Sequence, residues 1–225
     1  MQTGHPESPE RLRAVMERIR HAGLADELIE RRPGPVADEA LLRVHPAAHL
    51  ERLARIAPDH GLARVDMDTA MCPETLPAAR LAAGALVESV DGVMADDFKR
   101  AFCAVRPPGH HAETAQAMGF CFFNSIAVAA AHAMAHHGLE RVAVLDFDVH
   151  HCNGTVEIFR DDPRVLVCSS YQYPYYPDRM FDVVRDHVVH SRLAEGSHGL
   201  DFRHAVERQW IPAIERHRPQ LILVS

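Results

Sequence analysis

The residues best suited to chemistry are two aspartates and a histidine spaced two positions apart. Asp146, Asp148 and His150 follow the apolar run Val142–Leu145, which predicts a buried strand. Alternate residues of an extended chain point to the same side, so the three side chains share one face. Leaving two carboxylates and an imidazole buried and unpaired is costly, and a bound Zn²⁺, for which both donor types are suitable ligands, removes that cost. The alternative is an ordinary strand with one solvated face, which predicts an alternation that the apolar run lacks.

A second group of candidate residues lies in the segment Arg106-Pro107-Pro108-Gly109-His110-His111-Ala112. Its prolines restrict the backbone and its glycine permits tight geometry, which is typical of a rigid turn. Two imidazoles held on such a turn beside a metal can act as general base and general acid. The alternative is a pair of surface histidines in a loop.

A histidine pair is weak evidence by itself in this chain. The sequence has 17 histidines, for which random order gives roughly 1.3 adjacent pairs. Pairs occur at 110–111, 136–137 and 150–151. The pair at 136–137 closes an Ala-rich helix before Gly138, where a C-cap and the helix dipole favour it, and we interpret it as structural. The other two pairs depend on their place in the fold.

The rest of the chain predicts strands that alternate with helices. Helices are expected over 9–23, 46–57, 76–94, 124–137, 156–159 and 201–217, and strands over 101–105, 141–147, 165–169 and 220–224. This alternation predicts a single three-layer α/β/α domain over residues 1–225 with a mostly parallel sheet. Residues 171–199 are expected to form a long loop. Both histidine motifs begin at the carboxyl end of a predicted strand, where ligands bind in such sheets.

Composition limits the class of protein. The chain has 225 residues, 47% hydrophobic and 24% charged, which suits one soluble domain. A net charge of -7 disfavours nucleic acid as a partner and favours cationic ligands. No apolar run reaches the length of a membrane span, and the polar N-terminus does not resemble a signal peptide. Five cysteines without a Cys-x-x-Cys pair indicate a reducing, cytoplasmic setting.

Four segments, in order along almost the whole chain, resemble the zinc-dependent histone deacetylase family, which includes acetylpolyamine amidohydrolases and acetoin-utilisation proteins. The segments are 4–12, 106–112, 119–124 and 145–155. Asn153 and the segment Gln172-Tyr173-Pro174 are more similar to the class II and bacterial branch. The resemblance implies an arginase/deacetylase-like fold. It also implies zinc-dependent removal of acetyl or other acyl groups from lysine side chains of proteins or peptides, or from polyamines.

The resemblance implies a role for each residue of the centre. Asp148 and His150 are the implied Zn²⁺ ligands. His111 is the implied general base and later acid, and His110 is its electrostatic partner. Asp146 would support His110 and Asn153 would orient His111, contacts that set the tautomer and basicity of an imidazole.

The resemblance also implies residues for substrate and for a second ion. Phe120 would line the acyl-lysine channel, and the carbonyl of Gly119 would accept a hydrogen bond from the substrate amide. For Phe122 and Phe123 we prefer plain core packing. The family also holds a structural K⁺ ion, which is matched here by Asp146, Asp148, His150, Ser169 and Ser170.

Several family features have no match in this sequence. The predicted strand 221–225 ends where the family continues into a Gly-Phe-Asp segment with a third zinc ligand and then an oxyanion-stabilising Tyr, and the family's first strand would precede Gly4. We therefore interpret the chain as a fragment, incomplete at both ends and with the C-terminal part missing, and expect weak zinc binding and slow turnover. Cys152 replaces a usual Gly, Tyr171 a usual His, and Pro177-Asp178-Arg179-Met180 a Pro-Gly-Thr-Gly turn.

Two other functions compete with the zinc amidohydrolase. An arginase-like dimetal hydrolase would need an Asp two positions after His150, where Cys152 stands. A non-catalytic fragment that binds an acyl-amine or a partner protein is the alternative outside enzymes. Among substrates, protein lysines, acetylpolyamines and small amides all remain open.

Overall fold

The computed structural model describes residues 5–225. Gly4, the first residue of the 4–12 motif, lies outside them. A parallel sheet has four strands in the order β5-β4-β3-β6. Its strands are β3 (Val142–Asp146), β4 (Val165–Gln172), β5 (Val188–Leu193) and β6 (Leu221–Val224). Two short strands, β1 (Ala63–Arg64) and β2 (Ala70–Met71), form a separate antiparallel ribbon.

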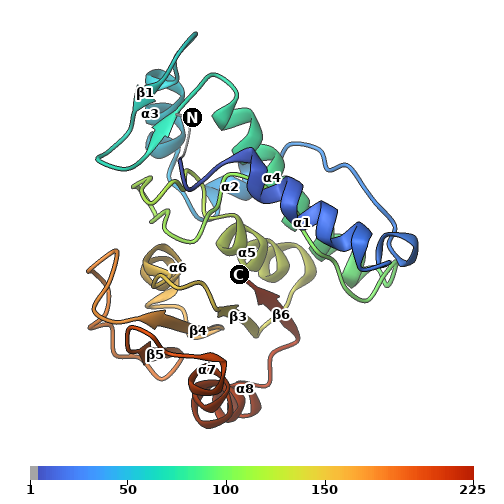
Figure 1. Ribbon diagram of the computed structural model, residues 1–225, viewed down its shortest axis with the longest axis vertical. Coiled ribbons are helices and arrows are strands. Elements are labelled where there is room, and N and C mark those ends of the chain that lie inside the picture. Colours follow the sequence, from blue (N-terminus) through green and yellow to red (C-terminus); the bar gives the residue numbers. More distant parts are fainter. Residues whose placement is uncertain (1–4) are drawn as a thin grey trace.

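Helices cover both faces of the sheet (Figure 1). One side carries α4 (Thr75–Met94) and α5 (Ser125–His137), and the other carries α7 (Gly199–Ala205), the π-helical turn η2 (Val206–Trp210) and α8 (Ile211–His217). Val142 and Val144 of β3 belong to the core cluster that includes α4 and α5, whereas Ala143 packs with Trp210 and Ala213. Alternate residues of β3 are buried in different layers, so the strand is apolar throughout. The expected three-layer α/β/α fold is confirmed.

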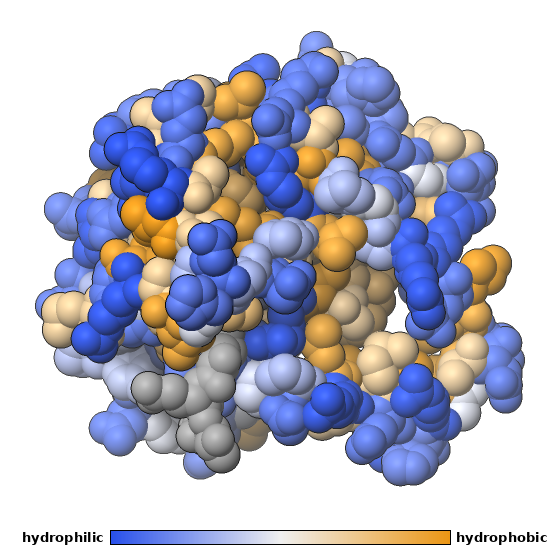
Figure 2. Space-filling view, turned by 90° about the horizontal axis from the view of Figure 1, so that it is seen from above, coloured by the Kyte–Doolittle hydropathy of each residue, from blue (hydrophilic) through white to orange (hydrophobic). Residues whose placement is uncertain are grey.

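The remaining helices precede the strands of the sheet in the sequence, except for the last of them, which lies beside the sheet between β3 and β4 in chain order. They are α1 (Pro9–His21), η1 (Ala25–Glu27), α2 (Asp38–Leu42), α3 (Ala47–Ile56) and α6 (Asn153–Phe159). Hydrophilic residues cover most of the face in Figure 2, and apolar residues show between them in small groups. Within residues 5–225, no helix combines the length and the apolar character needed to cross a membrane.

Two expectations about the elements are wrong. Residues 101–105 form no strand, because no described strand runs beside this segment to make a ladder with it. The expected loop 171–199 contains β5, which pairs in parallel with β4. The polar residues His190, Ser191 and Arg192 lie inside β5, so its sequence lacks the apolar run that identifies β3. The other expected helices and strands are found, some with shifted bounds.

Asn124 joins three of the sequence motifs. It caps α5, as the sequence predicts, because its side-chain oxygen accepts a hydrogen bond from the backbone N–H of Ala127 at 3.1 Å. Its amide nitrogen donates to the carbonyl of Ala112 at 3.1 Å and to the hydroxyl of Thr155 at 3.2 Å. The residue is fully buried. One side chain therefore fixes the start of α5, the 106–112 turn and α6 relative to one another.

The first turn of α6 lies directly against the 106–112 turn. A Cβ atom added to Gly154 would lie 2.2 Å from the carbonyl oxygen of Ala112 and 2.7 Å from that of His110. Both contacts are with backbone, which cannot turn aside as a side chain can. The close approach of these two backbones therefore requires glycine at 154.

His45 supports the same region from α2 and α3. The buried imidazole donates from Nδ1 to the carbonyl of Thr114 at 3.0 Å and accepts at Nε2 from the N–H of Asn124 at 2.9 Å. Both bonds together require the neutral ring. Burial, and then the neighbouring His49, lower the pKa of His45 to about 4.

We predict that Gly154→Ala lowers the free energy of unfolding by about 1–3 kcal/mol, the usual cost of overpacking a filled interior. The matched control is Gly199→Ala in the first turn of α7, where an added Cβ would meet only the side chain of Arg203 at 3.4 Å. Urea unfolding of both variants measures the difference. Equal stabilities would show that the backbones of α6 and the 106–112 turn are not in close contact.

We predict that stability falls with acid partly through His45. Folding lowers its pKa from 6.5 to about 4, so the unfolded chain takes up the proton first. This contribution is complete above about pH 6.5 and is lost as the pH falls toward about 4. Between pH 7.5 and 5.5 the free energy of unfolding should fall by about 1 kcal/mol less in His45→Gln than in the unmodified protein. The exposed control His60→Gln should keep the full dependence; an unchanged slope in His45→Gln would contradict the assignment.

Candidate active site

The structure brings both histidine motifs together at the carboxyl ends of the strands. Asp146 ends β3, and Asp148 and His150 follow in the loop before α6. The ring centroids of His110 and His111 are 4.0 Å apart, and those of His111 and His150 are 5.7 Å apart. Residues far apart in the sequence therefore meet beyond the carboxyl end of β3. The strand-end placement holds for the motif after β3, whereas the 106–112 turn reaches the same point without the strand expected over 101–105.

His110 is held by a buried carboxylate. Its Nδ1–H donates to Oδ2 of Asp146 at 3.0 Å, and both side chains are buried. The other oxygen of Asp146 accepts from the backbone N–H of Asp148 at 3.1 Å. Burial alone would lower the pKa of His110, but the charge and the hydrogen bond of Asp146 outweigh it, so this pKa lies above its ordinary value. The His110 ring therefore takes up a proton more readily than a free imidazole, and the resulting positive charge lies next to His111.

His111 is held as a neutral base. Its Nδ1 lies 2.8 Å from Oδ1 of Asn153, whose amide nitrogen donates to Oε1 of Glu113 at 2.8 Å. Because the amide nitrogen faces Glu113, the amide oxygen faces His111 and must accept from its Nδ1–H. Burial, and then the adjacent His110, lower the pKa of His111 to about 3. The lone pair is therefore on Nε2, to which no described residue donates a hydrogen bond.

Asp148 and His150 form a pair of possible metal donors. Oδ1 of Asp148 lies 2.9 Å from Nδ1 of His150 and also accepts from its backbone N–H at 2.8 Å. Two ligands of one tetrahedral zinc lie about 3.3 Å apart, given zinc–ligand distances of about 2.0 Å. Burial would raise the pKa of Asp148, but hydrogen bonds and positive charge from His150 and His110 hold it well below its usual range. The carboxylate is thus ionised, and the pair fits a divalent cation.

The part of the chain that the structure describes supplies only these two donors at this point. No further His, Cys, Asp or Glu completes a group of three with Asp148 and His150. Cys152 is fully buried in the core, where burial raises the pKa of its thiol well above the ordinary value. A protonated core thiol is a poor metal ligand, so Cys152 packs as an apolar residue here.

Of the two residues expected to contact substrate, Gly119 lies next to His111 and Phe120 follows it in the chain. Gly119 adopts a positive φ of 57°, and an added Cβ would lie 2.4 Å from the His111 ring. Phe120 follows with a φ of 68° and is only half-buried, with its ring edge-on to His5. Phe122 and Phe123 are buried in the core, as expected.

Ser169 and Ser170, the expected potassium residues of β4, are buried beside the strand that carries Asp146. Ser169 is the register partner of Asp146, and its hydroxyl lies 3.4 Å from the N–H of Cys152. Three of the five residues matched to the potassium site therefore lie in the neighbouring strands β3 and β4, and Asp148 and His150 lie in the loop after β3.

The sequence reasoning missed Glu113, Tyr175 and Tyr176. Glu113 directly follows the 106–112 motif and fixes the amide of Asn153. Tyr176 lies edge-on to His111 and His150, with centroid distances of 5.1 and 5.7 Å, and Tyr175 stacks on His150 at 5.3 Å. Both tyrosines come from the region expected to be an irregular loop. The aromatic-rich, repeated Tyr-Pro dipeptides at 173–174 and 176–177 were the available signal.

Comparison with known proteins identifies relatives along the whole chain. A family model, the histone deacetylase domain, matches residues 5–225. The histone deacetylase-like amidohydrolase of Pseudomonas aeruginosa is 43% identical, over 99% of this chain and 60% of that protein. The polyamine deacetylase HDAC10 of Mus musculus is 33% identical, over 97% of this chain and 35% of that protein. The solved HDA15 HD domain superposes with a TM-score of 0.93 at 31% identity, covering 100% of this chain and 67% of that one.

The chain thus spans 60% of the length of the Pseudomonas amidohydrolase and about a third of HDAC10. The sequence alone left an arginase-like hydrolase as an alternative to a deacetylase. The match to the histone deacetylase model favours the deacetylase family. The four motifs, the three-layer fold and a family match over residues 5–225 together show that this chain belongs to the histone deacetylase family of amide hydrolases.

Proposed function

We propose that this protein is a zinc-dependent amide hydrolase that removes acetyl or similar acyl groups from amines. The observation that carries the proposal is the arrangement around His111. The neutral ring of His111 lies beside the Asp148–His150 donor pair, and its Nε2 accepts no hydrogen bond from a described residue. Metal-assisted amide hydrolysis requires a general base next to a bound metal ion, and here the base His111 lies beside the two residues that could bind the metal.

Each residue of the site has a different role in the proposed reaction. When bound by Asp148 and His150, zinc supplies polarisation of the amide carbonyl and lowers the pKa of its water ligand. Nε2 of His111 takes the proton of the attacking water and returns it to the leaving amine. Asn153 accepts from Nδ1 and so fixes the tautomer whose lone pair is on Nε2, while burial and the adjacent His110 keep the ring neutral. His110, charged through Asp146, stabilises negative charge that develops nearby.

The proposed substrates are acetylated lysine side chains of proteins or peptides, or acetylated polyamines. The names of the relatives include a histone deacetylase-like amidohydrolase and a polyamine deacetylase. Both substrate classes contain an acylated amine, and polyamines also carry free cationic amines. A net charge of -7 favours cationic partners over nucleic acid. Gly119, next to His111, and Phe120 would contact the acylated amine.

Two further assignments belong to this proposal. Residues 1–225 would form one domain, because the two core clusters share the strands β3 and β4. A structural K⁺ would lie behind the zinc pair, held by residues of the adjoining ends of β3 and β4 and the loop that follows β3. These residues are Asp146, Asp148, His150, Ser169 and Ser170.

We predict that His111→Ala, in a complete version of this protein, lowers turnover of an acetyl-lysine or acetylpolyamine reporter by about 10² to 10⁴ while zinc content stays unchanged. The reason is that His111 moves protons whereas Asp148 and His150 hold the metal. Reporter hydrolysis and metal analysis by mass spectrometry, with the exposed His60→Ala as control, measure both quantities. Loss of zinc together with His111 would show that the ligands are wrongly assigned. An unmodified protein without chelator-sensitive turnover would favour the non-catalytic, acyl-amine-binding alternative.

A further inference from the structure

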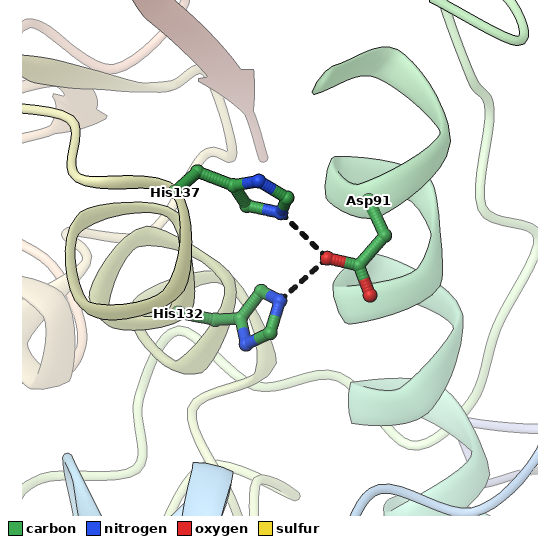
Figure 3. A group of neighbouring side chains, drawn as sticks. All are labelled: Asp91, His132 and His137. Atoms are coloured by element: carbon green, nitrogen blue, oxygen red, sulfur yellow. Dashed lines mark hydrogen bonds and ion pairs between the residues drawn. The ribbon is translucent and has the colours of Figure 1, made fainter. Parts of the chain in front are cut away.

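A second group of metal-binding residue types lies away from the active site, between α4 and α5. Asp91 is in the last turn of α4, and His132 and His137 are near the end of α5 (Figure 3). Nε2 of His132 lies 2.6 Å from Oδ1 of Asp91, and Nε2 of His137 lies 2.7 Å from the same oxygen. One donor atom from each residue lies within 4.8 Å of both others. Among residues 5–225 this is the one such group of three.

The group has the chemistry of an open zinc site. Two imidazoles and one carboxylate are three protein ligands that leave a fourth position for water. In Figure 3 both rings point at one carboxylate oxygen, while Oδ2 of Asp91 points away from them. Hydrogen bonds from His132 and His137 outweigh burial and hold the pKa of Asp91 below its ordinary value, so the carboxylate is ionised. The Nε2–Oδ1 distances of 2.6 and 2.7 Å are hydrogen-bond distances, so each imidazole moves away from the carboxylate oxygen, to about 3.3 Å, when a zinc ion takes the place of the two protons.

The group is reachable from solvent. Asp91 is 44% exposed at its side chain and His137 is 19% exposed. A hollow of about 280 Å³ lies beside it, lined by His132, His136, Arg43 and Glu39 among others. A hydrated cation can therefore arrive without unfolding α4 or α5.

The positive charge of Arg43 opposes a cation at this group. Its guanidinium lies 3.2 Å from Nδ1 of His132, and its other nitrogen donates to the exposed Glu39 at 2.6 Å. An Arg donor at Nδ1 places the ring proton on Nε2, where a metal would bind. Zinc binding at Nε2 moves that proton to Nδ1, so Arg43 must turn away with Glu39. Removing Arg43 also removes a nearby positive charge.

The geometry points to a second divalent-cation site, with Zn²⁺ bound by Asp91, His132 and His137, that ties α4 to α5. The sequence pattern assigned the pair at 136–137 only a helix-closing role, which the αL Gly138 at the end of α5 does support. Because α5 begins at Asn124, the site would stiffen a helix that positions the 106–112 turn. The inference does not depend on the proposed reaction.

Equilibrium dialysis against Zn²⁺ with metal analysis tests the site. We expect Asp91→Asn and His137→Gln to bind one equivalent fewer than the unmodified protein, or at least 10-fold more weakly at that equivalent. Both substitutions keep a hydrogen-bonding side chain, so the helices stay paired. The matched control is His136→Gln, which changes the adjacent histidine and should keep the full zinc content. Arg43→Met should bind the same equivalent more tightly.

Thermal unfolding gives a second readout. Zn²⁺ at 100 times its Kd should raise the Tm of the unmodified protein by about 5 °C more than that of His137→Gln. Equal zinc content in the unmodified protein, Asp91→Asn and His137→Gln would overturn the site, and so would equal Tm shifts. Unchanged affinity in Arg43→Met would overturn the use of Nε2 of His132 as a ligand.

Discussion

The contact between the first turn of α6 and the 106–112 turn is the constraint on which the proposed site depends. Gly154 allows the two backbones to meet at the carbonyl of Ala112, and Asn153, one residue earlier, reaches the ring of His111. Asn124 bonds to both sides of this contact. Because the proton-transfer group comes from one segment and the metal pair from the other, separating them would remove both functions together.

Burial and the hydrogen-bond partners together set the protonation of two adjacent imidazoles at this contact. His110 has a carboxylate partner and its pKa is raised, whereas His111 has an amide partner and its pKa is lowered to about 3. Two rings 4.0 Å apart repel one another if both are charged. The carboxylate of Asp146 outweighs burial at His110, whereas the amide of Asn153 does not outweigh burial and the charge of His110 at His111, so the pair has one cation and one base.

Much of the fold and part of the candidate site could be predicted from the sequence, because they depend on local sequence patterns. The apolar run Val142–Leu145 predicts the strand that ends at Asp146. Asp148 and His150 lie in the loop beyond it, so the extended spacing that predicts a shared face does not apply to them. Residues 101–105 look like a strand, yet strand formation needs a neighbour, which local sequence does not reveal. The polar strand β5 and the rings of Tyr175 and Tyr176 were missed because main-chain pairing and tertiary contact place them. The sharing of Asp91 by two histidines is likewise a tertiary feature.

In the proposed site, Asp148 and His150 hold a metal beside the neutral ring of His111. Anomalous diffraction at the zinc absorption edge, from crystals of the protein grown with zinc, tests it most directly. We expect an anomalous peak in contact with the carboxylate of Asp148 and Nδ1 of His150, on the side that faces His111. Zinc peaks elsewhere in the molecule with none at this pair, in a protein that hydrolyses acetylated amines, would contradict it.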